Sequence, residues 1–192
     1  MAKRILLAGV LGGLGLFFWG AISHTLLGLG DAGMQYLPQS QATMQSLAAS
    51  VPQSGFYAFP QGDRPGTLRP DQVGGPYGIL IYHTAGAPGS MGAQLLNEFI
   101  LNVVIATLAA FLLSLAPGLG GYGARVGFVF VVGAIAGSMN HIEYWNWYGY
   151  PSKFTLASIL DNLIGFLVIG LIAAAFVKPA AQGITAVPAK AA

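Results

Sequence analysis

Four long apolar runs, separated by polar or glycine-rich stretches, dominate the pattern of this chain. They cover residues 5–29, 94–115, 122–145 and 154–177. Each run is long enough for a helix that crosses about 30 Å of hydrocarbon, which takes about 20 residues. The pattern therefore predicts four transmembrane helices in a single membrane domain, residues 1–192.

The second and third connections between these runs are short, and short connections join antiparallel neighbours. We therefore expect an all-α integral membrane protein with an up-down-up-down bundle of four transmembrane helices. Ala21-Ile22-Ser23 resembles a small-residue cleavage site, but the first run stays apolar beyond it. We expect that run to be a membrane span rather than a cleaved leader.

Residues 30–92 break the pattern, because they are rich in Gly, Pro, Gln and Ser. We expect this excursion to lie outside the membrane. Ser40 is positioned to cap a short helix over residues 41–50. Aromatic and β-branched segments bounded by Pro and Gly predict two antiparallel strands, at residues 56–59 and 77–82. A two-stranded ribbon is marginal alone, so it should lie on the bundle or on a partner.

The composition agrees with a membrane protein, since 55% of residues are hydrophobic and 7% charged, against about 25% charged in soluble domains. The absence of cysteine excludes disulfides, thiolate catalysis and Cys-ligated metals. A net charge of +2 without a basic cluster argues against nucleic acid as a partner. The sequence holds no GxSxG, Walker or Rossmann motif, so we lean against an enzyme. The expected partners are the lipid bilayer and other membrane protein subunits.

Positive charge is distributed unequally between the two sides that an even number of spans creates. One side carries Lys3, Arg4, Arg125, Lys178 and Lys190. By the positive-inside rule this side is cytoplasmic, which places both termini there and residues 30–92 on the extracytoplasmic (periplasmic) side of the cell membrane. Residues 180–192 form a small-residue tail that we expect to be flexible.

Polar side chains in the outer halves of the spans are the candidate functional residues. They are His24, Glu98, Asn102, Asn140, His141, Glu143 and Asp161. Charged groups in hydrocarbon are costly, so they usually face a bundle interior and carry function. We therefore predict an outward-opening polar pocket in which Asp161 lies beside at least one of His24, Glu98 and His141. Asn162 is a weaker candidate, because it points about 100° away from Asp161 around the helix.

Three interpretations of this polar cluster compete. It can be structural, with hydrogen bonds between helices at a wet interface. It can hold a transition metal through His24, His141, Glu98 and Asp161, although the sequence has no HExxH or ExxH motif. It can ligate haem or chlorin through His24 and His141. Quinone or proton-relay roles are further alternatives. We predict no cofactor, with a metal or haem/chlorin as the alternative.

Two further groups of residues indicate how the helices pack and where they end. Small residues at four-residue spacing let helices approach closely, and they are Gly9, Gly13, Gly133 and Gly137. Aromatic residues at the end of the third run are typical of a membrane-interface belt, and they are Tyr144, Trp145, Trp147, Tyr148 and Tyr150.

These observations favour a small non-catalytic four-span membrane protein, a subunit or accessory factor of a larger membrane assembly. The alternative is a redox or hydrolytic membrane protein that binds a metal, haem or chlorin in the polar cluster. Catalytic residues cannot be assigned from the sequence, because no catalytic motif is present.

Overall fold

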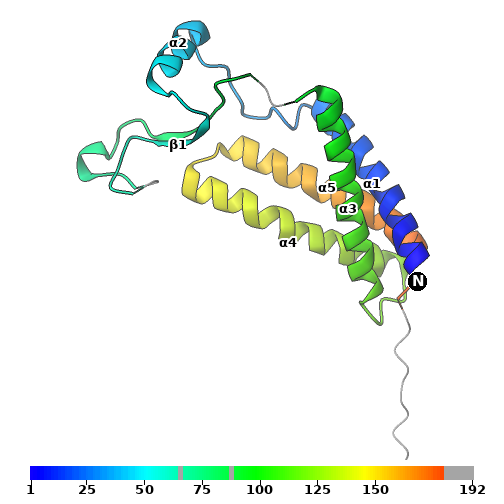
Figure 1. Ribbon diagram of the computed structural model, residues 1–192. Helices are drawn as coiled ribbons and strands as arrows, with labels where there is room; N and C mark the ends of the chain where they lie inside the picture. The colour runs from blue at the N-terminus through cyan, green and yellow to red at the C-terminus, as the bar shows by residue number, and fades with distance from the viewer. Residues whose placement is uncertain (65–66, 87–88, 180–192) are drawn as a thin grey trace, which may run out of the picture.

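A computed structural model describes residues 1–64, 67–86 and 89–179, so the predicted tail at 180–192 lies outside the described residues. Four long helices form a bundle: α1 (Ala2–Thr25), α3 (Met91–Ser114), α4 (Tyr122–Tyr148) and α5 (Ser152–Phe176) (Figure 1). All four are long and apolar enough to cross a membrane. The predicted fold class is confirmed, and the protein is an integral membrane protein whose apolar helices contact lipid.

The first helix ends earlier than its apolar run. Helix α1 stops at Thr25, and the remainder of the predicted span forms turns. Gly28 has a positive φ of 62°, and the Leu29 N–H donates to the Ser23 carbonyl at 2.9 Å, which folds the chain back. Hydropathy could not locate this end, because residues 26–29 are as apolar as the helix itself apart from the glycine.

The helices pack as two pairs. Helix α1 packs against α3, α4 packs against α5, and the α1–α5 contact joins the pairs, whereas α3 and α4 touch only slightly. In Figure 1 the pairs lie close together where α1 begins and diverge toward the excursion. We call these the terminal end and the ribbon end of the bundle. The consequence is a bundle that is tightly closed at one end only.

The hydrophobic core lies mainly toward the terminal end. Its fully buried members include Ala8, Ala106, Ala110, Leu113, Val129, Ile169, Ala173 and Val177. Many of them are alanines, and small side chains let helix backbones approach without a large cavity. This packing leaves the ribbon end, with its larger and more polar side chains, more open.

Glycines mark the closest helix contacts. A Cβ at Gly9 or Gly13 would collide with Thr107 or Val103 of α3, respectively. On α4, a Cβ at Gly133 would collide with Phe166 of α5. Gly137, one turn further along α4, meets α5 in the same way. Two lines of glycine therefore form the α1–α3 and α4–α5 contacts.

At the terminal end, a buried arginine ties α4 to the last turn of α5. The Arg125 side chain is 6% exposed. Its Nε donates to the Ala174 carbonyl at 3.2 Å, and its Nη1 donates to the Gly120 carbonyl at 2.7 Å. Ala174 is among the last residues of α5, whose carbonyls lack intrahelical partners and carry the negative end of the helix dipole. The positive charge is thus balanced by backbone carbonyls.

The excursion contains helix α2 (Ser40–Ser50), a short 3-10 helix η1 (Pro70–Gln72), and a ribbon of strands β1 (Gly55–Phe59) and β2 (Gly78–Tyr82). The strands pair antiparallel, with Phe56 opposite Ile81. The capping role predicted for Ser40 is wrong, because Ser40 is the first helical residue and Gln39 precedes it at φ 51°. This left-handed turn at Gln39 starts the helix without a side-chain cap.

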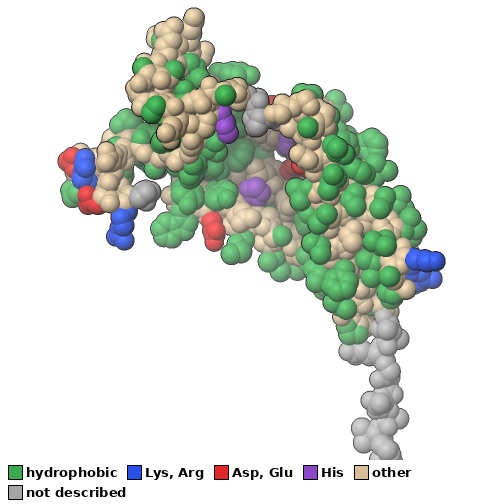
Figure 2. All heavy atoms as spheres, in the orientation of Figure 1, with side chains coloured by type: hydrophobic (Ala, Val, Ile, Leu, Met, Phe, Trp, Pro, Cys, Tyr) green, Lys and Arg blue, Asp and Glu red, His purple; other side chains and the backbone are tan. Residues whose placement is uncertain are grey.

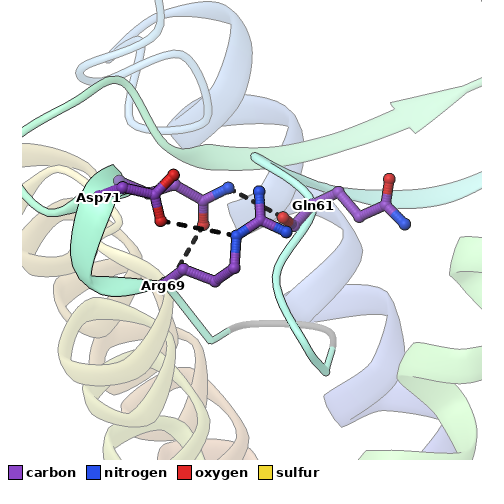
Figure 3. Close-up of polar contacts among 4 residues, drawn as sticks. Gln61, Arg69 and Asp71 are labelled. Atoms are coloured by element: carbon purple, nitrogen blue, oxygen red, sulfur yellow. Dashed lines mark hydrogen bonds and ion pairs between the residues drawn. The ribbon is translucent and has the colours of Figure 1, made fainter.

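A small hydrogen-bonded network closes the long connection between the two strands. The Gln72 side chain donates to the Gln61 carbonyl at 2.9 Å and accepts from the Arg69 backbone N–H at 2.9 Å. Arg69 Nε lies 3.6 Å from Asp71 Oδ1 (Figure 3). This ion pair is largely exposed and contributes little energy. The network holds the two ends of the connection near each other.

Candidate functional site

A cavity of about 360 Å³ lies at the ribbon end, where residues from all four long helices meet. Its polar lining residues are His24, Glu98, Asn102, His141, Ser158, Asp161 and Asn162. Figure 2 shows histidine and acidic side chains around the hollowed part of this face, beneath the excursion. Leu29 and Gly30, from the turn after α1, also line it. The divergence of the helix pairs therefore produces a polar cavity with a loop at its border.

His24 lies in the last turn of α1 with one ring nitrogen already occupied. Its Nδ1 is 3.0 Å from the Gly20 carbonyl and 2.9 Å from Ser23 Oγ. A carbonyl can only accept, so Nδ1 carries a proton. In the neutral ring, Nε2 is then an acceptor. A Cβ on Gly30 would collide with this ring, so the turn lies directly over it.

Asp161 borders the cavity from α5, and its carboxylate has no partner among the described residues. The Oδ1 atom is buried and makes no hydrogen bond. The Asp161 backbone carbonyl does have one, because Trp19 Nε1 donates to it at 3.1 Å. No direct hydrogen bond or ion pair joins Asp161 to His24, Glu98 or His141 in the described part of the chain. The predicted pairing through a bridging water stays a prediction.

Helix α3 contributes Glu98 and Asn102, which are four residues apart and therefore share a face. Asn102 is 4% exposed, and no hydrogen bond joins its amide to another described residue. Glu98 is exposed at the border of the cavity. The α3 wall thus presents one buried amide and one accessible carboxylate.

Asn162 lines the cavity together with Asp161, although it was expected to be the weaker candidate. The lining face of α5 includes Ser158 and Phe166 as well. Its centre falls between positions 161 and 162, so two residues about 100° apart can both border one wide cavity. The Asn162 amide is already engaged, since Nδ2 donates to the Gly133 carbonyl at 2.8 Å.

Helix α4 brings only one of its three candidate polar residues to the cavity. His141 lines it and is half-buried, whereas Asn140 and Glu143 are exposed and outside the lining. Neighbouring positions point about 100° apart on a helix, and positions two apart about 200°. Asn140 and Glu143, three positions apart, share an exposed side of α4, whereas His141 faces the cavity.

The metal interpretation finds no ligand set in the described residues. No group of three His, Asp or Glu side chains comes together in an arrangement that could hold a metal ion. Transition-metal sites in proteins generally need at least three such ligands. The haem or chlorin alternative stays a prediction, which the visible absorption of the purified protein tests.

The aromatic residues at the end of α4 pack on one another and beneath the ribbon. Tyr144 makes ring contacts with Tyr148 and Tyr150, and Trp145 Nε1 donates to Ser152 Oγ at 3.0 Å. A second cavity of about 270 Å³ separates this end from the ribbon. It is lined mainly by aromatic and aliphatic side chains, among them Phe56, Phe59, Tyr77, Ile79, Trp147 and Tyr148. Trp147 and Tyr148 therefore face the ribbon across this cavity, and the assignment of the five aromatics to a membrane-interface belt stays a prediction.

Sequence reasoning missed the aromatic part of the polar cavity. Trp19, Phe154 and Phe166 line it beside the polar residues. Trp19 lies one position before Gly20 and five before His24, about 100° and about 140° away from them around α1, so the spacing did not indicate it. No known protein family, curated protein or solved structure matches this chain.

Proposed function

We propose that this protein is a small non-catalytic subunit or accessory factor of a larger membrane assembly. The observation that carries this proposal is the excursion, which is ordered into helix and ribbon but has almost no core of its own. In its described part, Tyr82 is the one buried residue. Such a segment gains little from burial within the chain, so a partner surface would stabilise it.

The excursion also exposes large apolar side chains that a bilayer around the helices does not cover. Phe56 and Ile81 form a cross-strand pair, 66% and 65% exposed, in which Phe56 also borders the cavity beside Trp147, and Tyr36 is fully exposed. The ribbon and α2 project beyond the ribbon end of the bundle (Figure 1). Contiguous exposed apolar residues of this kind are typical of protein interaction sites.

We infer that the partner is the extramembrane part of another membrane protein. The Phe56–Ile81 pair carries no charge, and the ion pair of Arg69 with Asp71 lies in the loop beyond the strands. An apolar centre with a polar rim is the usual anatomy of a stable interface. If both termini are cytoplasmic, as the Lys and Arg distribution predicts, this interface lies on the extracytoplasmic side.

The proposal is tested by replacing the cross-strand pair with serine, as Phe56→Ser with Ile81→Ser, in the native membrane. Loss of the apolar pair should shift the protein from a defined high-mass species to its own mass on native gels. Val73→Ser is the matched control, because Val73 is 73% exposed in the same excursion but lies outside the strands.

A photo-crosslinking residue at position 81 gives the second readout. One defined protein adduct is expected from position 81, and none from position 73. Crosslinks to lipid alone, or a wild-type protein that already migrates at its own mass, would overturn the proposal.

A further inference from the structure

We propose that the cavity at the ribbon end binds a small organic cation, with a primary ammonium group that contacts Asp161 and Glu98. This inference is independent of the proposed subunit role, because the cavity is lined by the four long helices and the turn after α1, all within this chain. It rests on the charge of the lining, on its unoccupied acceptors and on its aromatic wall.

The lining carries an excess of negative charge. Asp161 and Glu98 each bring a carboxylate, and among the described residues no lysine or arginine lines the cavity. Neither carboxylate forms an ion pair within the described part of the chain. An opposite charge within about 4–6 Å favours the ionised form of a carboxylate. A cation is therefore the ligand charge that this cavity selects.

The cavity contains acceptor atoms without a donor among the described residues. Asp161 Oδ1 is buried without a hydrogen-bond partner among the described residues, and His24 makes its hydrogen bonds through Nδ1, which leaves Nε2 without one there. Asn102 is 4% exposed, and its amide has no partner among the described residues. The Trp19 N–H and one N–H of the Asn162 amide donate to backbone carbonyls. A buried acceptor without a donor is costly, and a primary ammonium brings three donors.

The remaining wall suits an organic cation better than a bare metal ion. Trp19, Phe154 and Phe166 add aromatic surface, and aromatic faces attract ammonium groups. No three potential metal ligands come together in the described residues. A volume of about 360 Å³ is at the low end of small-molecule sites. The site therefore fits a compact amine with an apolar body.

Benzylamine and benzyl alcohol form a matched pair of probes, since they share an aromatic body and differ in the ammonium group. Both are titrated into the full chain, purified in detergent, by calorimetry and by thermal unfolding. Benzylamine should bind and raise the Tm, because ligands of the native state stabilise it. Benzyl alcohol should have no comparable effect.

Two near-isosteric variants then assign the site. Asp161→Asn should weaken benzylamine binding by about tenfold or more, which corresponds to about 1.4 kcal/mol. Glu98→Gln should weaken it as well. Asp71→Asn is the control, because the Asp71 side chain is 73% exposed in the excursion and outside the cavity.

Four outcomes would overturn the inference. They are equal binding of benzyl alcohol, unchanged affinity in Asp161→Asn, no benzylamine binding by the folded wild-type protein, and stoichiometric binding of ZnCl₂ in place of the amine. All measurements use the isolated chain, so failure here leaves the subunit proposal untouched, and failure of the subunit test leaves this inference untouched.

Discussion

The side-chain amide of Asn162 donates a 2.8 Å hydrogen bond to the backbone carbonyl of Gly133, across the contact between α4 and α5. Gly137, one turn further along α4, leaves the space that this amide occupies, since a Cβ there would collide with it. A polar side chain of one membrane helix is thus satisfied by the backbone of its neighbour. The absence of a side chain at position 137 makes this approach sterically feasible.

Gly137→Leu should therefore lower the stability of the bundle. Insertion of a large side chain into a packed contact costs about 1–3 kcal/mol. Thermal unfolding in detergent measures the effect. Gly127→Leu is the control, because nothing lies within 4 Å of a Cβ at Gly127. Leu167→Ala should also lower the stability less than Gly137→Leu does, since Leu167 is 37% exposed. Equal Tm values for the two leucine variants would show that position 137 is not in a packed contact.

Gly137→Ala and Asn162→Ala should be energetically coupled. Each alone lowers the free energy of unfolding, the first through collision and the second through loss of the hydrogen bond, worth about 1 kcal/mol. Truncation of the amide removes most of the atoms that the new methyl group meets. The double variant should therefore lose less stability than the sum of the single variants.

The control for this coupling combines Gly9→Ala with Asn162→Ala. Gly9 contacts Thr107 at the other helix pair, so these two changes share no neighbour. Their effects should add within about 0.5 kcal/mol. If the effects of Gly137→Ala and Asn162→Ala add as fully as those of the control combination, position 137 and Asn162 are not in direct contact.

Arg125→Met should destabilise the terminal end of the bundle by about 2 kcal/mol or more. Hydrogen bonds to charged groups contribute about 1.5–3 kcal/mol to the free energy of unfolding. The change leaves the carbonyls of Ala174 and Gly120 without the donor that Arg125 supplies. Arg125→Lys should lower the stability by an intermediate amount, because an ammonium lacks the planar guanidinium fork that reaches both carbonyls. Arg4→Met is the exposed control. A Tm for Arg125→Met equal to that of Arg4→Met would rule out this role.

The orientation in the membrane can be measured with single cysteines, because the chain contains none. Asp63→Cys lies in the excursion and Pro117→Cys in the turn between α3 and α4, and both positions are exposed. A membrane-impermeant maleimide should label position 63 in intact cells, and position 117 only after permeabilisation. The reverse pattern would invert the topology that the positive-inside rule predicts.

Most of the fold could be predicted from the sequence, because hydrophobic length is a local property. A run such as 94–115 must form a helix in hydrocarbon, where every backbone polar group needs a partner within its own segment. The glycines at 133 and 137 share a helix face by spacing alone. The ribbon was predictable from the aromatic and β-branched segments that became β1 and β2.

The tertiary structure decided what spacing cannot supply, namely how each helix is rotated and which helices are neighbours. Adjacent residues such as Asp161 and Asn162 border one cavity because the helix pairs diverge, which depends on side-chain volumes along all four helices. The early end of α1 depends on a backbone turn at Gly28 that hydropathy does not detect. The sequence by itself determined the number of spans and the polar residues they contain. Spacing alone separates His141 from Glu143 by about 200° around α4. Only packing decided that His141 lines the cavity while Glu143, two positions later, is exposed.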